Sequence, residues 1–317
     1  MCAVLFALGG CLVGPDYRRP DVRSPSAFRD AAGEACGDIA DLPWWSVFKD
    51  PILQDWVRAS LTNNYDLRVV LSRIDQARAL QMQSQSRFLP EMDYGGIASR
   101  GQNSFLSMPA LNGGRTVKGF FGGVQAVWEI DLWGRVRRMD EAARANYMAS
   151  LEGRHAVMVS LVGHVSRAYF ELLELDDQLA IAKRTRESYE HTFKLFDDQH
   201  ANGLASKLEL SRAKAAVHAV SARIPDLERQ ISLKENELSV LTGNNPGPVM
   251  RAASLASQAV DVEIPVGLPS SLLERRPDIR MAEERVRAAN AEIGAALGDF
   301  FPRVGLTTFL GATSTEL

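Results

Sequence analysis

The length, composition and charge of the chain limit the classes of protein to which it can belong. Its 317 residues suffice for two ordinary domains, and a composition that is 46% hydrophobic and 24% charged is typical of a folded chain rather than a disordered one. A formal net charge of -3 provides no broad basic surface, so nucleic-acid binding is not expected.

The first residues resemble a bacterial export signal. Residues 1–10 are apolar and end in small residues directly before Cys11, although no basic residue precedes that cysteine. The run Leu8-Gly9-Gly10-Cys11 resembles the lipobox, in which the signal is cut before a cysteine that is then acylated. We therefore expect a signal peptide remnant in residues 1–10 and lipidation at Cys11, with a free thiol in an ordinary signal region as the alternative. Cys36 would then be unpaired, so no disulfide framework is expected.

The segment after the signal predicts an extended arm followed by helices. After Cys11, no stretch approaches the roughly 18 to 20 apolar residues that a membrane-spanning helix needs. Residues 11–65 are punctuated by prolines and predict an arm, with a short helix beginning after Asp50-Pro51 because proline is tolerated in a first helical turn. A second helix should run from Asp66 to about Phe88, because Pro90 cannot continue it.

After this helix the pattern changes to the alternation of β-strands. Strands are predicted near residues 92–103, 120–133 and 303–312, and the second is the clearest. Its apolar face would carry Val124, Ala126, Trp128, Ile130 and Leu132, and its polar face Gln125, Glu129 and Asp131. Length and alternation suit a strand that crosses an outer membrane with its apolar side chains toward lipid. A half-buried strand of a soluble sheet has the same pattern, so the window itself leaves both open.

A long antiparallel helical hairpin follows. One helix should run from residue 136 to about 200 and a second from 206 to 242, because apolar residues recur at spacings of three and four in both. Gly203 would end the first helix and Ser206 would cap the second. Pro225 should kink or break the returning helix. Since that helix is the shorter one, the helix from Asp66 would continue its line end to end.

The sequence also contains an internal repeat. A shift of 212 positions aligns Asp66–Gly95 with Asp278–Thr307 without a gap and with seven identities, including a Phe-x-Pro stop at 88–90 and 300–302. Chance similarity of two amphipathic helices hardly supplies that stop at the same phase, so we infer a duplication. Residues 66–247 would form the first structural repeat (helix, two strands, helical hairpin), and residues 248–317 a linker and the start of a second repeat.

Taken together, these segments resemble the TolC-type outer membrane efflux channels, in the lipoprotein lineage called NodT. The resemblance runs through the lipobox with GPDYRRP, and through WWSVFKDP, NNYDLRVVLSRIDQAR, WEIDLWGRVRRMDEAARA, NGLASKLELSRA and ERRPDIRMAEERVRAANAEIG. It implies a mainly α fold with membrane β-strands. In such channels three protomers form one tube, in which four strands from each make a twelve-stranded barrel and long helices form a tunnel across the periplasm.

The resemblance also implies a function and functional residues. It implies a lipid-anchored channel in the outer membrane of a Gram-negative bacterium, a passive trimeric duct that exports small molecules with an inner membrane pump and a periplasmic adaptor. Adaptor contact is implied at the hairpin tip, and an entrance gate at Glu209. The implied tip residues are Gly203, Leu204, Ala205 and Ser206. From the residues alone, the glycine is equally a helix stop and the glutamate a solvated helix charge.

One departure from the family pattern concerns the end of the chain. Members carry a second long hairpin and a fourth strand where residues 307–317 end this sequence, inside its third strand. We therefore expect a truncated gene product or a fragment, whose open strand edges leave its assembly in question.

No constellation of residues indicates catalysis. The five histidines are dispersed without a paired metal-ligand spacing, and phosphate-loop, nucleophile-elbow and zinc-helix motifs are absent. We predict no enzyme activity, no metal and no cofactor. The alternatives to a channel are a periplasmic adaptor-like coiled-coil protein, a non-functional fragment of the channel, or an enzyme on a helical scaffold. A strand after each helix–proline stop disfavours the adaptor.

Overall fold

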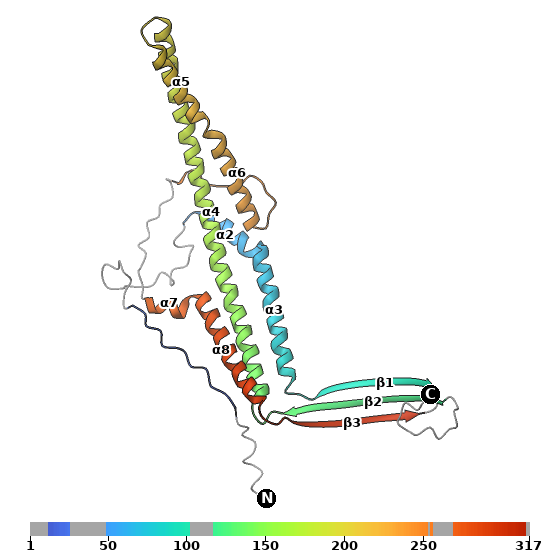
Figure 1. Ribbon diagram of the computed structural model, residues 1–317. Helices are drawn as coiled ribbons and strands as arrows, with labels where there is room; N and C mark the ends of the chain where they lie inside the picture. The colour runs from blue at the N-terminus through green and yellow to red at the C-terminus, as the bar shows by residue number, and fades with distance from the viewer. Residues whose placement is uncertain (1–11, 26–48, 102–116, 253, 256–268, 315–317) are drawn as a thin grey trace. The chain divides into compact units, whose positions relative to one another are not determined.

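The computed structural model describes residues 12–25, 49–101, 117–252, 254–255 and 269–314. The predicted signal in residues 1–10, the lipidation candidate Cys11 and Cys36 lie outside these ranges. Over the described residues the chain forms helices α2 to α8 and strands β1 to β3 (Figure 1). The elements are α2 (Pro51–Asn63), α3 (Tyr65–Ser86), β1 (Glu91–Gly101), β2 (Val117–Ile130), α4 (Arg135–Ala201), α5 (Lys207–Ser221), α6 (Ile224–Leu241), α7 (Pro269–Arg275), α8 (Pro277–Gly298) and β3 (Val304–Ser314).

The chain divides into two compact units. Unit 1 comprises Met1–Val22, Arg73–Glu152 and Arg280–Leu317, and unit 2 comprises Arg23–Ser72 and Gly153–Ile279. Helices α3 and α4 each contribute residues to both units. The sheet therefore belongs to unit 1 and the hairpin tip to unit 2.

The sheet of unit 1 is antiparallel, with the strand order β1-β2-β3. Strand β2 pairs on both sides, and its central residue Val124 lies opposite Tyr94 and Leu310. The three predicted strands are confirmed, but the prediction that β2 continues beyond Ile130 is wrong.

The end of β2 has a local physical cause. The carboxylate of Asp131 accepts hydrogen bonds from the backbone N–H groups of Val136 (3.1 Å) and Arg137 (3.0 Å), so it caps the first turn of α4. Gly134 adopts a positive φ of 77° in the same turn, which favours glycine. Leu132, predicted as a strand residue, consequently lies in the turn between β2 and α4.

The core of unit 2 confirms the part of the predicted hairpin seam between α4 and α6, whereas α5 contributes no buried residue. Helices α5 and α6 return along α4 (Figure 1), and Lys183 and Lys234 form ion pairs across the seam with Glu228 and Glu171. The chain leaves regular helix at residues 222–223, next to Pro225 in the first turn of α6, as the sequence predicts. The core consists of Leu53 and Val57 of α2, Leu161, Val165, Ala168, Tyr169, Leu172, Leu173 and Leu175 of α4, Leu227, Ile231 and Leu238 of α6, and Val249.

The end of α6 meets the beginning of α3 within unit 2. The Asn64 side chain donates a hydrogen bond to the carbonyl oxygen of Leu241 at 2.9 Å. Gly243, with a φ of +71°, approaches so closely that a Cβ there would lie 2.7 Å from the Asn63 carbonyl oxygen. The two shorter helices therefore follow one another end to end, as their lengths predict.

Helices α3 and α8 have the same length and equivalent bounds. Each has 22 residues, and a shift of 212 positions carries Tyr65–Ser86 onto Pro277–Gly298. Strands β1 and β3, which follow them, each have 11 residues. Helix, turn and strand thus recur with the spacing of the sequence repeat.

Helix α4 corrects one sequence expectation. Among the described helices, it is the one long and apolar enough in an 18-residue window to cross a membrane by length and composition. The expectation that no stretch after Cys11 approaches this requirement is therefore wrong by that measure. Seven side chains of α4 between Leu161 and Leu175 pack in the core of unit 2, and a core helix meets the same criterion.

A buried hydrogen-bonded pair fixes α2 against α4. The Tyr169 hydroxyl donates to Asp50 Oδ2 at 2.6 Å and accepts from the Ala252 N–H at 3.2 Å. The second oxygen of Asp50 caps α2 by accepting from the Ile52 N–H at 2.8 Å. Burial, and then the neighbouring Asp50, raise the pKa of Tyr169, so the phenol stays neutral and keeps its proton for the carboxylate.

We predict that Tyr169→Phe destabilises unit 2 by about 1–3 kcal/mol, because it leaves a buried carboxylate short of one donor. Denaturant unfolding of the purified protein measures this loss. Tyr189→Phe on the same helix is the matched control, since Tyr189 is exposed, and it should leave the unfolding midpoint unchanged. Equal stabilities of the two variants would contradict the prediction.

Candidate functional site

The register of the sheet separates two chemically different faces. Residues directly opposite each other in an antiparallel pair share a face, so all even-numbered strand residues lie on one face and all odd-numbered residues on the other. The apolar residues of the even face are Met92, Tyr94, Ala98, Phe120, Val124, Ala126, Trp128, Ile130, Val304, Leu306, Leu310 and Ala312. No Asp or Glu occurs among the even-numbered residues of the three described strands.

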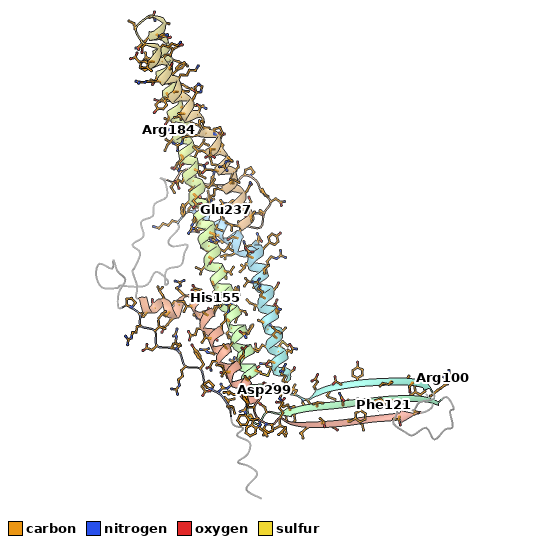
Figure 2. All side chains as sticks on the ribbon, in the orientation of Figure 1. Arg100, Phe121, His155, Arg184, Glu237 and Asp299 are labelled. Carbon is orange, nitrogen blue, oxygen red and sulfur yellow. The ribbon has the colours of Figure 1, made fainter. Side chains whose placement is uncertain are left out.

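The two cations of the even face lie at one end of the sheet. Arg100 and Lys118 are register partners, and Arg100 lies at the end of β1 that is remote from α3 (Figure 2). Between them and the turns to the helices, the even face is uncharged. Its polar side chains are the hydroxyls of Thr308 and Ser314, so contact of this part with lipid would bury no charge.

The odd face carries the polar groups. Gln125 donates to Asp93 at 3.4 Å, and the Arg135 guanidinium binds both oxygens of Glu129, at 3.0 and 2.6 Å. Farther along the sheet, the rings of Phe121 and Phe309 stack with their centroids 5.8 Å apart. The alternation predicted from one strand therefore extends over all three.

Of the predicted lipid-facing residues, the structure brings four together on the even face of β2. These are Val124, Ala126, Trp128 and Ile130. Leu132 lies outside the strand and does not share that face by register. The indole N–H of Trp128 donates to the Phe88 carbonyl oxygen at 3.1 Å and ties the strand to the turn after α3.

The hairpin tip is built by two local capping motifs. The first ends α4, where Gly203 has a φ of +73° and the Leu204 N–H reaches back to the Gln199 carbonyl oxygen at 2.8 Å. A Cβ at Gly203 would meet no atom within 4 Å, so the backbone conformation, rather than space, requires glycine. The predicted stop at this position is confirmed.

The second motif begins α5. The Ser206 hydroxyl accepts from the Glu209 N–H at 3.2 Å, while the Glu209 carboxylate accepts from the Ser206 N–H at 2.7 Å and from its hydroxyl at 2.8 Å. This reciprocal pair is a capping box, so the predicted cap is confirmed. The hydrogen bonds from Ser206 lower the pKa of Glu209. The predicted gate residue thus has a local role in shaping the tip.

The tip also presents apolar surface. The Leu204 side chain is 80% exposed, and Leu208, one turn further along the chain, is also exposed. Ala205 connects the two capping motifs, and its carbonyl oxygen lies 2.9 Å from Nδ1 of His200. Exposed leucines on a rigid turn are suited to contact with another protein.

Sequence reasoning missed Arg138, the largest fully buried side chain of the described residues. It contacts the segment that begins at Leu12, through Val13, Gly14 and Asp16. A signal was present, because Arg138 shares a helical face with buried small residues. Those residues are Ala142, Ala145 and Ala149.

The described residues contain no group of three or more His, Cys, Asp or Glu side chains that could hold a metal ion.

Two features together define the class of this protein. One face of the sheet is mainly apolar and carries no acidic residue, and the same chain contains a long helical hairpin with an exposed apolar tip. This combination is typical of a channel protein whose strands contribute to a membrane barrel.

The family follows from comparison with known proteins. The model of the outer membrane efflux protein family matches residues 56–244 and 268–317. The chain belongs to this family and is an outer membrane protein of the TolC-type channel fold. The resemblance seen in the sequence is confirmed, as is the mainly helical fold with membrane strands.

Individual relatives agree. The toluene efflux pump outer membrane protein TtgC of Pseudomonas putida is 33% identical over 100% of this chain and 66% of its own length. The cation efflux system protein CusC of Escherichia coli is 31% identical over 99% of this chain and 68% of its own length. The solved structure of the outer-membrane channel OprN has a TM-score of 0.84 at 32% identity, and the match covers 96% of this chain and 68% of OprN. The chain thus spans about two thirds of the length of these relatives.

We predict that Ser206→Ala frays the first turn of α5, because the Glu209 N–H loses its acceptor. A cap of this kind contributes about 1 kcal/mol, so hydrogen exchange of the Glu209 amide should accelerate roughly fivefold. Ser211→Ala, at an exposed position of the same helix, is the control and should leave that rate unchanged. The assignment fails if both variants exchange at the wild-type rate.

Proposed function

We propose that the chain is the outer membrane channel component of a tripartite efflux system. It contributes to a trimeric passive duct through which small molecules leave the cell, driven by an inner membrane pump that is reached through a periplasmic adaptor protein. The observation that carries this proposal is the two-faced sheet at the ends of the long helices. The names of the relatives, which include toluene and cation efflux proteins, support export as the shared activity.

The even face of the sheet is the lipid-facing surface of the barrel. Val124, Ala126, Trp128 and Ile130 lie on this face of its central strand, β2. Strands β1 and β3 both run antiparallel to β2, so they point in the same direction and each leaves one edge unpaired within the described sheet. In lipid such edges need partners, which supports closure of the barrel with strands from other copies.

The hairpin tip is the adaptor contact. Gly203, Leu204, Ala205 and Ser206 form a turn whose shape is fixed by capping motifs on both sides. The exposed Leu204 has no packing role in the hairpin, so its apolar surface is available to a partner. Glu209 lies one turn from this contact, and as an exposed carboxylate it carries a negative charge at neutral pH, which supports its assignment to the entrance gate.

The organisation of the chain follows from the same function. Residues 1–10 are the remnant of a signal peptide, and Cys11 carries the lipid anchor at the head of an arm comprising residues 11–65. Residues 66–247 form the first repeat, and residues 248–317 a linker and the start of the second. The equal lengths of α3 and α8 support this division. No cofactor, catalytic residue or nucleic acid takes part.

A periplasmic adaptor-like protein is the second candidate function, because such a protein can also contain a long hairpin. A non-functional fragment of the channel is the third. The sheet disfavours the adaptor, because an apolar face on strands that follow the helices serves no purpose in water. Export by the protein would reject the inactive fragment.

The assignment of the even face to lipid can be tested by placing a lysine on one or the other face of β2. We predict that Val124→Lys prevents stable insertion, because a lysine on the lipid face near the bilayer midplane costs about 2–4 kcal/mol. Val127→Lys is the matched control, since Val127 is as exposed as Val124, 43% against 42%, but lies on the odd face beside Glu91. Urea extraction of outer membranes measures insertion, and equal extraction of both variants would contradict the assignment of the faces.

The tip is tested by Leu204→Asp. This change should weaken binding of the adaptor protein from the same efflux system by about tenfold or more, because it places a charge in an apolar contact. Cells that rely on the protein should lose resistance while trimers still form. Met250→Asp, at a side chain 75% exposed elsewhere in the same unit, is the control. Unchanged binding and resistance in Leu204→Asp would reject the tip as the adaptor contact.

A further inference from the structure

The segment from Leu12 to Arg19 has no regular secondary structure, yet nearly every one of its residues is bound to a helix of unit 1. On α8, Asn290 donates to the Pro15 carbonyl oxygen at 2.8 Å, and Glu283 accepts from the Tyr17 hydroxyl at 3.3 Å. Arg19 lies 3.1 Å from the same carboxylate, and the Arg287 guanidinium lies over the Tyr17 ring, 5.0 Å from its centroid. The segment therefore follows one side of α8.

On the other side, the segment is held by Arg138 of α4. This guanidinium donates to the carbonyl oxygens of Val13 (3.3 Å) and Gly14 (3.1 Å) and to the carboxylates of Asp16 and Glu141, both at 2.8 Å. Its side chain is only 2% exposed. Without the segment, Glu141 would be the one acceptor that remains of these four, and water would have to replace the other three. The burial of Arg138 therefore depends on the docked segment.

Two glycines make the close fit possible. Gly14 has a φ of +100°, and a Cβ there would lie 2.4 Å from the Cα of Gly294 on α8. A Cβ at Gly294 would in turn lie 2.9 Å from the Arg138 side chain. The repeat-equivalent position on α3, 212 residues earlier, is Met82, whose side chain would fill this space. Helix α8, and not its counterpart α3, is thus shaped to receive the segment.

We propose that residues 12–19 act as a strap that staples α8, the first helix of the second repeat, to α4 of the first, and that Arg138 is the positioning residue that sets the register of the strap. The strap begins where both repeats pass between helix and strand. The Val13 N–H donates to the Trp133 carbonyl oxygen at 3.1 Å, and the Trp133 indole donates to the Pro302 carbonyl oxygen at 2.9 Å.

The strap also has a consequence for the proposed lipid anchor at Cys11. This consequence rests on the proposed function. Cys11 directly precedes Leu12, and Leu12 is so close to the turn before α4 that a Cβ on Gly134 would lie 2.5 Å from its side chain. A strap in fixed register therefore holds Leu12, the residue that follows the proposed anchor, beside this turn.

The test compares two arginines of α4 in the full chain. In Arg138→Gln the strap should be released, so that trypsin cleaves after Arg18 at least about tenfold faster than in the wild type and the Val13 amide exchanges its hydrogen correspondingly faster. Arg144→Gln is the matched control, because it makes the same change at an exposed arginine of the same helix and the same unit. Wild-type cleavage in Arg138→Gln, or equal acceleration in both variants, would overturn the proposal.

A second variant leaves the buried arginine intact. Gly14→Ala places a methyl group against the backbone of Gly294 and strains a positive φ, so it should also release the strap while the amides of Arg138 to Glu152 remain protected. Protection of the strap at the wild-type level in Gly14→Ala would overturn the proposal even if Arg138→Gln failed to fold.

A third variant separates this inference from the proposed anchor. In Cys11→Ser, incorporation of radiolabelled palmitate should be lost, whereas slow tryptic cleavage after Arg18 should persist, because the contacts of the strap begin at residue 12. Persistent labelling would reject Cys11 as the lipidation site and leave the strap standing. Rapid cleavage in the unacylated chain would show that the contacts of residues 12–19 do not keep the strap bound without the lipid, and would reject the strap proposal.

Discussion

The structure depends on one constraint, which is that every backbone N–H and C=O group of a strand in lipid needs a partner within the protein. Strand β2 meets this constraint because it pairs on both sides over most of its length. Strands β1 and β3 each pair with β2 along one edge, and their other edge has no partner within the described sheet. The described sheet would therefore satisfy the constraint in lipid only with further strands at both of its edges, which supports the proposed closure with strands from other copies.

The same constraint applies where helices give way to strands. Pro90 and Pro302 end the two helices, and the carbonyl groups next to these stops need donors from elsewhere. The end of β2 and the turn after it supply them, since the Trp128 indole donates to the Phe88 carbonyl oxygen and the Trp133 indole donates to that of Pro302. Two tryptophans five residues apart thus serve the turns of both repeats, and stacking of Trp133 on Phe301 at 4.8 Å reinforces the second.

Much of this could be predicted from the sequence, because the deciding interactions are local. The alternation in β2, the break at Pro225, and the stop and cap at Gly203 and Ser206 all depend on residues close together in the chain. The missed features depend on long-range contacts. From the sequence, Arg138 is interpreted as a surface cation, because the strap residues that contact it lie far away in the chain. The end of β2 was misjudged because Asp131, which continues the polar alternation, is used by α4 as its cap.

The two repeats are equivalent in their elements but not in their packing. Gly294 lies under the strap, whereas Met82 occupies the equivalent position of α3 and its side chain is exposed. Contact with the N-terminal segment requires a residue without a Cβ at position 294, because Gly14 approaches its Cα so closely. No such contact restricts the exposed Met82 on the described part of α3, so a large apolar side chain fits there. Equivalent backbones therefore carry different side chains because the N-terminal segment packs against one repeat helix and not against both.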